Sequence, residues 1–127
     1  MADYRTSMSR AVGLGAAGGG TEHWWAHRIS SIALIPLTIL ALPPLIRTIG
    51  GGYEAVQATY GSLWNATIMA LLILVTFRHL QHGLQAVVED YVHQKVARTT
   101  LILLNTWFCG LFAVAGVFAV AQIALSA

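Results

Sequence analysis

The sequence predicts an all-α integral membrane protein, a bundle of three transmembrane helices. Of its 127 residues, 57% are hydrophobic and only 9% are charged, whereas an average soluble domain is about 25% charged. Three stretches are apolar over the roughly 20 residues that a helix needs to cross a bilayer. We expect these spans at about residues 26–49, 63–91 and 99–125. Their long apolar runs lack polar alternation, which indicates helices rather than the strands of a membrane barrel.

The three spans fill most of the chain and leave no room for a soluble catalytic domain. We expect residues 1–20 to form a flexible cytoplasmic lead-in, because they contain a glycine-rich stretch, and residues 21–127 to form the anchor domain. The first apolar run is long enough to remain as a span, so no cleavable signal is expected. The net charge of +2 does not indicate binding to nucleic acid.

The first span, residues 26–49, contains Pro36, Pro43 and Pro44. Proline lacks a backbone donor, so we expect these residues to bend the helix or to end it early. Three consecutive glycines at residues 50–52 mark the turn that follows.

The third span carries small and mildly polar residues that suit close packing against other helices. They are Asn105, Gly110, Ala113, Gly116, Ala119 and Gln122. The span also holds Cys109, the single cysteine, which excludes an internal disulfide. The chain has no Cys-x-x-Cys-His motif either, so any haem here would be held by coordination alone.

The positions of the basic residues indicate the orientation of the chain. Loops on the cytoplasmic side of a membrane carry an excess of lysine and arginine. Basic residues occur before the first span and between the second and third spans, whereas the loop after the first span has only Arg47. The basic residues of the two cytoplasmic segments are Arg5, Arg10, Arg28, Lys95 and Arg98. The amino terminus is therefore expected in the cytoplasm and the carboxyl terminus in the periplasm.

The second span, residues 63–91, grades from an apolar start to a polar end. A helix of this length measures about 43 Å, which exceeds the roughly 30 Å hydrocarbon core. Counted from Trp64 at the outer interface, His79 lies about 22 Å along the axis and thus within hydrocarbon. Asp90 and Tyr91 reach the cytoplasmic interface.

His79 is a candidate ligand of haem iron, because a neutral imidazole is a good axial ligand and a histidine in a span is costly to desolvate. Gly83 follows one turn later and would leave clearance for a flat macrocycle. Spacing alone leaves open a histidine that bonds to a neighbouring helix, and it leaves His82 as a rival ligand. Gly83 is one turn from His79 but directly adjacent to His82, which favours His79.

A second polar face of the same span points to partner helices. Its residues, Arg78, His82, Gln85 and Glu89, share helical spacing. Such a stripe must look into a protein interior rather than at lipid.

Asp90 and Tyr91 lie at the depth where an amphipathic quinone headgroup would enter. Tyr91 could donate to a quinone carbonyl, and Asp90 could relay protons or hold the network; an ordinary acidic and aromatic helix end is the alternative. Arg28, at the cytoplasmic start of the first span, suits an anionic group. That group could be a haem propionate, a lipid phosphate or a helix end.

The chain resembles the hydrophobic membrane anchor subunits of succinate dehydrogenase, the smaller of the two cytochrome b subunits of respiratory complex II, of the bacterial and mitochondrial-like type. The resemblance covers about Thr21 to the carboxyl end and includes the three-helix layout. It rests on His79-x-x-x-Gly83 followed by Glu89-Asp90-Tyr91-Val92, and on His23-Trp24-Trp25-Ala26-His27-Arg28 before the first span. His27 stands where relatives of bacterial type often carry glutamine.

The resemblance implies the cofactors of the site and the roles of its residues. His79 would be one axial ligand of a b-type haem, and the second histidine would come from the partner cytochrome b anchor protein. Arg28 would face the haem propionates, and Tyr91 with Asp90 would line a ubiquinone site.

The resemblance also implies a role in a complex. The chain would be the anchor of a succinate:ubiquinone oxidoreductase in the bacterial inner membrane and would not be catalytic alone. FAD and iron–sulfur clusters would belong to the partner flavoprotein and iron–sulfur subunits. Two alternatives remain at this stage: a haem b anchor subunit of a fumarate reductase or another quinone oxidoreductase, and a non-redox membrane scaffold or small transporter subunit.

Overall fold

A computed structural model describes residues 6, 8 and 20–126. Nearly all of the expected lead-in, with Arg5 and Arg10, lies outside the described residues. The described part of the chain is helical and contains no strand, as the sequence predicts. Its helices are α2 (Gly20–Thr48), α3 (Gly52–Tyr60), α4 (Leu63–Tyr91) and α5 (Lys95–Ser126).

Three of these helices are long and apolar enough to cross a membrane, which confirms the predicted number of spans. The candidate spans are Trp24–Thr48, Leu63–Tyr91 and Lys95–Ser126. The middle span has the predicted bounds, whereas the third begins at Lys95 instead of residue 99. The predicted start was too late because hydropathy marks only where a helix enters hydrocarbon. The first turn of α5 is polar and precedes that point.

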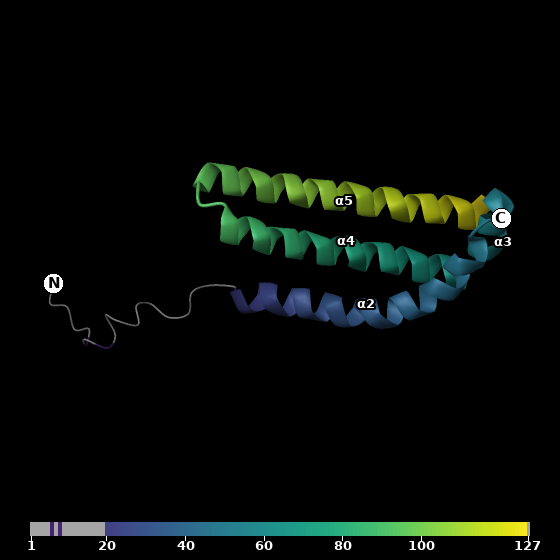
Figure 1. Cartoon of the computed structure of the whole chain (residues 1–127), viewed down its shortest axis with the longest axis horizontal. Helices are drawn as coiled ribbons and strands as arrows, with labels where there is room; N and C mark the ends of the chain where they lie inside the picture. Colours follow the sequence, from purple (N-terminus) through teal and green to yellow (C-terminus); the bar gives the residue numbers. More distant parts are fainter. Residues whose placement is uncertain (1–5, 7, 9–19, 127) are drawn as a thin grey trace.

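Helix α2 continues through its three prolines. The helix runs without a break from Gly20 to Thr48 with Pro36, Pro43 and Pro44 inside it, so of the two outcomes expected at the prolines, a bend or an early end, the early end does not occur. Its later part curves toward α3 (Figure 1). A proline removes one intrahelical hydrogen bond, and a bend at that point lets the rest of the ladder continue.

A short helix, α3, joins the first two spans where the sequence predicted only a turn. The glycine turn itself is confirmed, because Gly50 and Gly52 have φ of +80° and +65°, a region that favours glycine. Helix α3 lies near the carboxyl terminus (Figure 1), where Nε2 of Gln57 donates to the backbone oxygen of Ser126 at 2.9 Å. Tyr60 at the end of α3 is buried, and this burial raises the pKa of its phenol.

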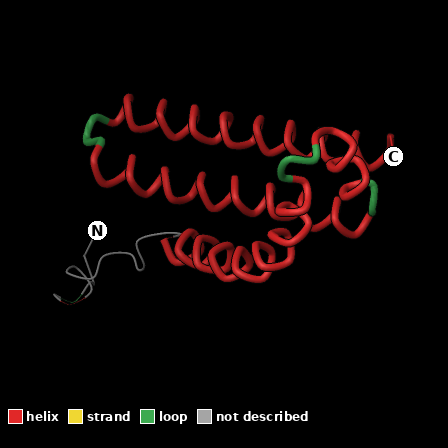
Figure 2. The backbone as a smooth tube through the Cα atoms, turned by 45° about the vertical axis from the view of Figure 1, so that its right-hand side comes forward, coloured by secondary structure: helices red, strands yellow, loops and turns green. Residues whose placement is uncertain are grey.

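The three long helices form a row with α4 in the middle (Figures 1 and 2). Helix α4 packs against α2 on one side and α5 on the other, while the described parts of α2 and α5 do not contact each other. A row buries less surface than a closed bundle. The buried apolar residues are Ala41, Tyr60, Ala66, Ile68, Cys109 and Ala113. Two faces of α4 thus stay open to lipid or to other subunits.

Small and polar side chains hold α5 against α4. A Cβ added at Gly116 would lie 3.0 Å from Cγ2 of Ile73, so the two helices approach closely there. Nδ2 of Asn105 donates to the backbone oxygen of Gln81 at 2.9 Å. The predicted packing role is confirmed for these two residues of α5, whereas Gly110 faces open space.

Candidate functional site

His79 lies on the side of α4 that packs against α2. Its Nδ1 is 3.1 Å from Oγ of Ser30 and 3.4 Å from Oγ of Ser31. Its ring stacks on the imidazole of His27, with centroids 4.4 Å apart and an interplanar angle of 21°. One turn of α2 therefore contacts both an edge and a face of the His79 ring.

The two serine hydroxyls also bond to their own helix. Oγ of Ser30 donates to the backbone oxygen of His27 at 2.8 Å, and Oγ of Ser31 donates to the same atom at 2.9 Å. Ser30 is only 8% exposed. Among the described residues, no hydrogen bond engages Nε2 of His79. One ring nitrogen is thus held by α2 and the other stays accessible to a ligand.

Gly83 lies one turn beyond His79 and also faces α2. A Cβ added there would be 3.9 Å from Nε2 of His27, and no other atom comes within 4 Å. An added Cβ would therefore make only an ordinary contact, with the imidazole of His27, and the clearance for a macrocycle stays a prediction. The role of Gly83 beside a haem stays a prediction.

His82 and the predicted polar stripe lie on a neighbouring side of α4. His82 is 5% exposed and thus more deeply buried than His79. Along the stripe, Nε2 of Gln85 donates to Oε1 of Glu89 at 2.8 Å. Depth of burial alone does not exclude His82 as a ligand, so the preference for His79 rests on the contacts of its ring.

Arg78 borders a groove of about 490 Å³ between α2 and α4. Small residues of α2, namely Ala26, Ser30 and Ala33, line part of this groove. Nη1 of Arg78 donates to Oε1 of Gln81 at 3.1 Å, and no carboxylate in the described part of the chain pairs with it. A cation at the edge of an apolar groove suits an anionic group on a largely apolar body.

Asp90 and Tyr91 are the last two residues of α4, and both are exposed. Tyr91 lies twelve residues beyond His79, about 18 Å along the axis. The structure therefore does not bring the two candidate sites into contact. No side-chain hydrogen bond within the described residues occupies either Asp90 or Tyr91, so both polar groups are accessible.

Arg28 is exposed and packs on an aromatic ring. Its Cζ lies 5.0 Å from the centroid of the Trp24 ring, a cation–π geometry. The residue directly follows His27 and so lies near the depth of His79. Within the described part of the chain no carboxylate pairs with its guanidinium, and its predicted anionic partner stays a prediction.

The sequence analysis did not single out Ser30 and Ser31, and it named His27 only as part of the motif that carries the resemblance. These residues share one turn of α2, because the serines follow the histidine by three and four positions. The sequence feature that could have identified this turn is a pair of hydroxyl side chains in an apolar span, one turn after a histidine. The partner of that turn, however, lies 49 positions away in the chain.

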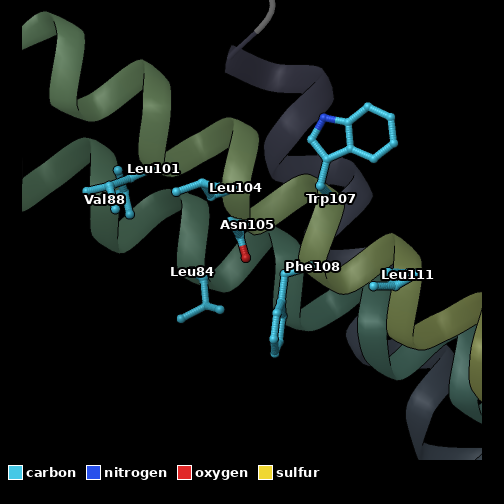
Figure 3. Close-up of a pocket in the computed structure, with 8 residues that line it drawn as sticks. All are labelled: Leu84, Val88, Leu101, Leu104, Asn105, Trp107, Phe108 and Leu111. Atoms are coloured by element: carbon cyan, nitrogen blue, oxygen red, sulfur yellow. The ribbon is translucent and has the colours of Figure 1, made fainter.

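A second groove, of about 640 Å³, lies between α4 and α5 (Figure 3). Its lining is apolar except for Asn105, whose amide already bonds to the backbone of Gln81. Leu84 and Phe108 point into the region below the helices in this view, while Trp107 points away. The groove fits an apolar chain and offers no group for catalysis or coordination.

The described residues contain no cluster of three or more His, Cys, Asp or Glu side chains that could enclose a metal ion. A metal ion held by these residues alone is therefore not supported. A haem iron makes a smaller demand, because its porphyrin supplies most ligands and one histidine per side completes the set.

The chain is similar to known proteins over most of its length. Residues 2–119 match the family described as succinate dehydrogenase/fumarate reductase transmembrane subunit. The succinate dehydrogenase hydrophobic membrane anchor subunit of Paracoccus denitrificans is 35% identical over 124 residues, which cover 98% of this chain and 95% of the relative.

More distant relatives carry similar names. The corresponding protein of Rickettsia bellii (strain RML369-C) is 26% identical over 118 residues, 93% of this chain and 94% of the relative. The succinate dehydrogenase membrane anchor subunit of Reclinomonas americana is 27% identical over 88 residues, 67% of this chain and 73% of the relative. No solved structure matches the chain significantly.

Proposed function

Because the chain belongs to the family of succinate dehydrogenase/fumarate reductase transmembrane subunits, we propose that it anchors a succinate:ubiquinone oxidoreductase, holds one side of a b-type haem and contributes to the ubiquinone site. The names of the relatives favour succinate dehydrogenase over fumarate reductase. Membership of this family also argues against a non-redox scaffold or a transporter subunit.

The proposed complex divides the work among its subunits. This chain supplies membrane helices, and the flavoprotein and iron–sulfur subunits supply FAD, the clusters and the oxidation of succinate. The partner cytochrome b anchor protein supplies the second histidine of the haem. We place the complex in the bacterial inner membrane, with the α4–α5 loop on the cytoplasmic side, because Lys95 and Arg98 directly follow this loop at the start of α5.

His79 is the proposed axial ligand, and its two ring nitrogens carry this assignment. Nδ1 is held by Ser30 at 3.1 Å, while no hydrogen bond from the described residues engages Nε2. A histidine that binds a metal through one nitrogen commonly bonds through the other to a fixed polar group. The residues present thus fit a haem, which when bound supplies a one-electron redox centre.

Gly83 and Arg28 are proposed to complete this chain's half of the haem site. The missing side chain at Gly83 leaves room beside His79. The exposed guanidinium of Arg28 can turn from Trp24 toward a propionate and form a bidentate pair.

Tyr91 and Asp90 are proposed to act on ubiquinone at the cytoplasmic end of α4. The phenol of Tyr91 would donate a hydrogen bond to a quinone carbonyl oxygen and orient the ring. Asp90, beside it in the chain, would accept and pass on protons, since reduction to the quinol requires a proton at each carbonyl oxygen. Their exposure supports access by a ligand.

The test of the haem role is a reduced-minus-oxidised spectrum of the complex purified through this chain, normalised to flavin. We expect a b-type band in the natural protein, loss of that band in His79→Ala, and its retention in the matched variant His82→Ala. A natural complex without the band would refute the haem role. A band that survives in His79→Ala and disappears in His82→Ala would move the ligand to His82.

A further inference from the structure

We propose that Ser30 is a positioning residue for His79: its hydroxyl accepts a hydrogen bond from Nδ1–H and holds the imidazole in the tautomer whose Nε2 can bind iron. Ser30 would thereby tune the reduction potential of the haem. This inference rests on the proposed haem role of His79. It adds a residue of a different helix to that site.

The direction of the hydrogen bond follows from the other bonds of the hydroxyl. A serine hydroxyl has one hydrogen to donate and lone pairs to accept. The hydrogen of Ser30 is directed to the backbone oxygen of His27 at 2.8 Å, so its lone pairs face Nδ1 of His79 at 3.1 Å. Nδ1 therefore carries the proton, and Nε2 of the neutral ring is left as the acceptor.

Ser31 is the weaker partner of the same ring nitrogen. Its oxygen lies 3.4 Å from Nδ1, beyond the usual range of about 2.7–3.2 Å for an N–H···O hydrogen bond. Ser31 also directs its hydrogen to the backbone oxygen of His27. The two neighbouring hydroxyls thus offer a graded comparison, with Ser30 as the dominant acceptor.

The contacts of the His79 ring also restrict its rotation. The hydrogen bond to Ser30 fixes one edge, and the stacked imidazole of His27 covers one face. Ser30 is buried where α2 packs on α4, so water does not compete easily for Nδ1. This combination resembles the outer contacts of metal-binding histidines, which set both the tautomer and the orientation of the ring.

A hydrogen bond from Nδ1–H raises the electron density on Nε2 and makes it a stronger donor. A stronger donor stabilises ferric over ferrous iron and lowers the reduction potential. Removal of the Ser30 hydroxyl should therefore raise the haem potential and weaken haem retention. Substitution of such outer partners typically costs about 10- to 100-fold in metal affinity.

The experiment is a potentiometric titration of the haem in the purified complex, with haem per flavin measured in parallel. We expect Ser30→Ala to shift the midpoint potential upward and to lower haem occupancy. Ser30→Thr should keep both at their natural values, because threonine keeps the hydroxyl. Ser31→Ala should give a smaller upward shift. Thr67→Val is the matched control, because Thr67 bonds to the backbone of its own helix in the same way but lies twelve residues from His79.

The outcomes separate the two proposals. A natural complex without haem would refute the proposed function and the inference with it. A natural complex with haem whose potential is unchanged in Ser30→Ala would overturn the inference alone, as would an equal shift in Thr67→Val. If Ser30→Ala does not assemble, the other two serine variants decide. The inference is supported if Ser31→Ala raises the midpoint potential while Ser30→Thr keeps the potential of the natural complex. It is overturned if Ser30→Thr binds haem but has a raised potential.

Discussion

Tyr91 ends α4 with its side chain 78% exposed, so its hydroxyl is free to bond outside this chain. Tyr91→Phe removes this hydroxyl and keeps the ring. A net hydrogen bond contributes about 0.5–1.5 kcal/mol, so we expect succinate-to-quinone turnover to fall roughly two- to twelvefold. Succinate oxidation with an artificial acceptor that bypasses the quinone should not change.

A matched control for this variant lies at the opposite end of the row. Tyr53 is also exposed but belongs to α3, so Tyr53→Phe should leave both activities unchanged. Equal losses of both activities in Tyr91→Phe would indicate weaker docking of the soluble subunits and would count against a quinone contact.

At the residue scale, the sequence singles out a residue more readily than its partners. His79 could be identified because an imidazole in an apolar run requires a physical reason. Ser30 could not, because its role depends on how α2 is rotated against α4 and on a contact between residues 49 positions apart. A serine in a span does not by itself indicate a functional site, because its hydroxyl can bond to the backbone of its own helix.

At the element scale, Gly116 and Gly110 give a matched pair on α5. Alanine gains the same helix propensity at both positions, so the difference between the two variants isolates the contact of the added methyl group. The methyl group at Gly116 would meet Cγ2 of Ile73 at 3.0 Å, whereas that at Gly110 meets nothing within 4 Å. We expect Gly116→Ala to be less stable than Gly110→Ala by about 1–3 kcal/mol, the cost of overpacking.

This difference is measured by thermal unfolding of the purified complex, with the loss of helix packing or the release of haem as the signal. Gly116→Ala should unfold at the lower temperature. Identical unfolding temperatures would show that Ile73 moves aside at no cost and that the close approach of α4 and α5 is not specified at this point.

The elements themselves were predicted unevenly, for physical reasons. The start of α4 follows from hydropathy, whereas its polar end, which runs from Arg78 to Tyr91, was predicted from the helical spacing of its polar residues. Helix α3 was missed because nine residues with Glu54, Gln57 and Thr59 carry no membrane signal. Of the bend and the early end that were expected for α2, the early end does not occur, because helical neighbours on both sides of a proline can keep the ladder of hydrogen bonds continuous through a bend.

At the scale of the whole molecule, the row of helices explains why the proposed haem site would be incomplete in one chain. Among the described helices, α4 packs along its length against α2 and α5 and meets only the short α3 at one end. The groove beside Arg78 has no carboxylate from the described residues. A cation in a span is costly unless it faces a polar partner. The sequence indicated partner helices from the polar stripe, but the open face of the row could be seen only once the packing order was known.

The orientation of the row decides which solution the proposed quinone site faces, and this orientation is tested by labelling single cysteines. Cys109 is 2% exposed, so the natural chain should not react with a maleimide that cannot cross membranes. Glu54→Cys on α3 and Gln94→Cys in the α4–α5 loop introduce exposed thiols at opposite ends of the row. In intact bacterial spheroplasts we expect the thiol at position 54 to be labelled, and the thiol at position 94 to be labelled only after permeabilisation and removal of the soluble subunits.

The reverse pattern would place Tyr91 and the basic residues at the start of α5 outside the cytoplasm. An iron–sulfur protein docked on the cytoplasmic side could then not deliver electrons to a quinone at Tyr91, so this single result bears on the orientation and on the quinone proposal together.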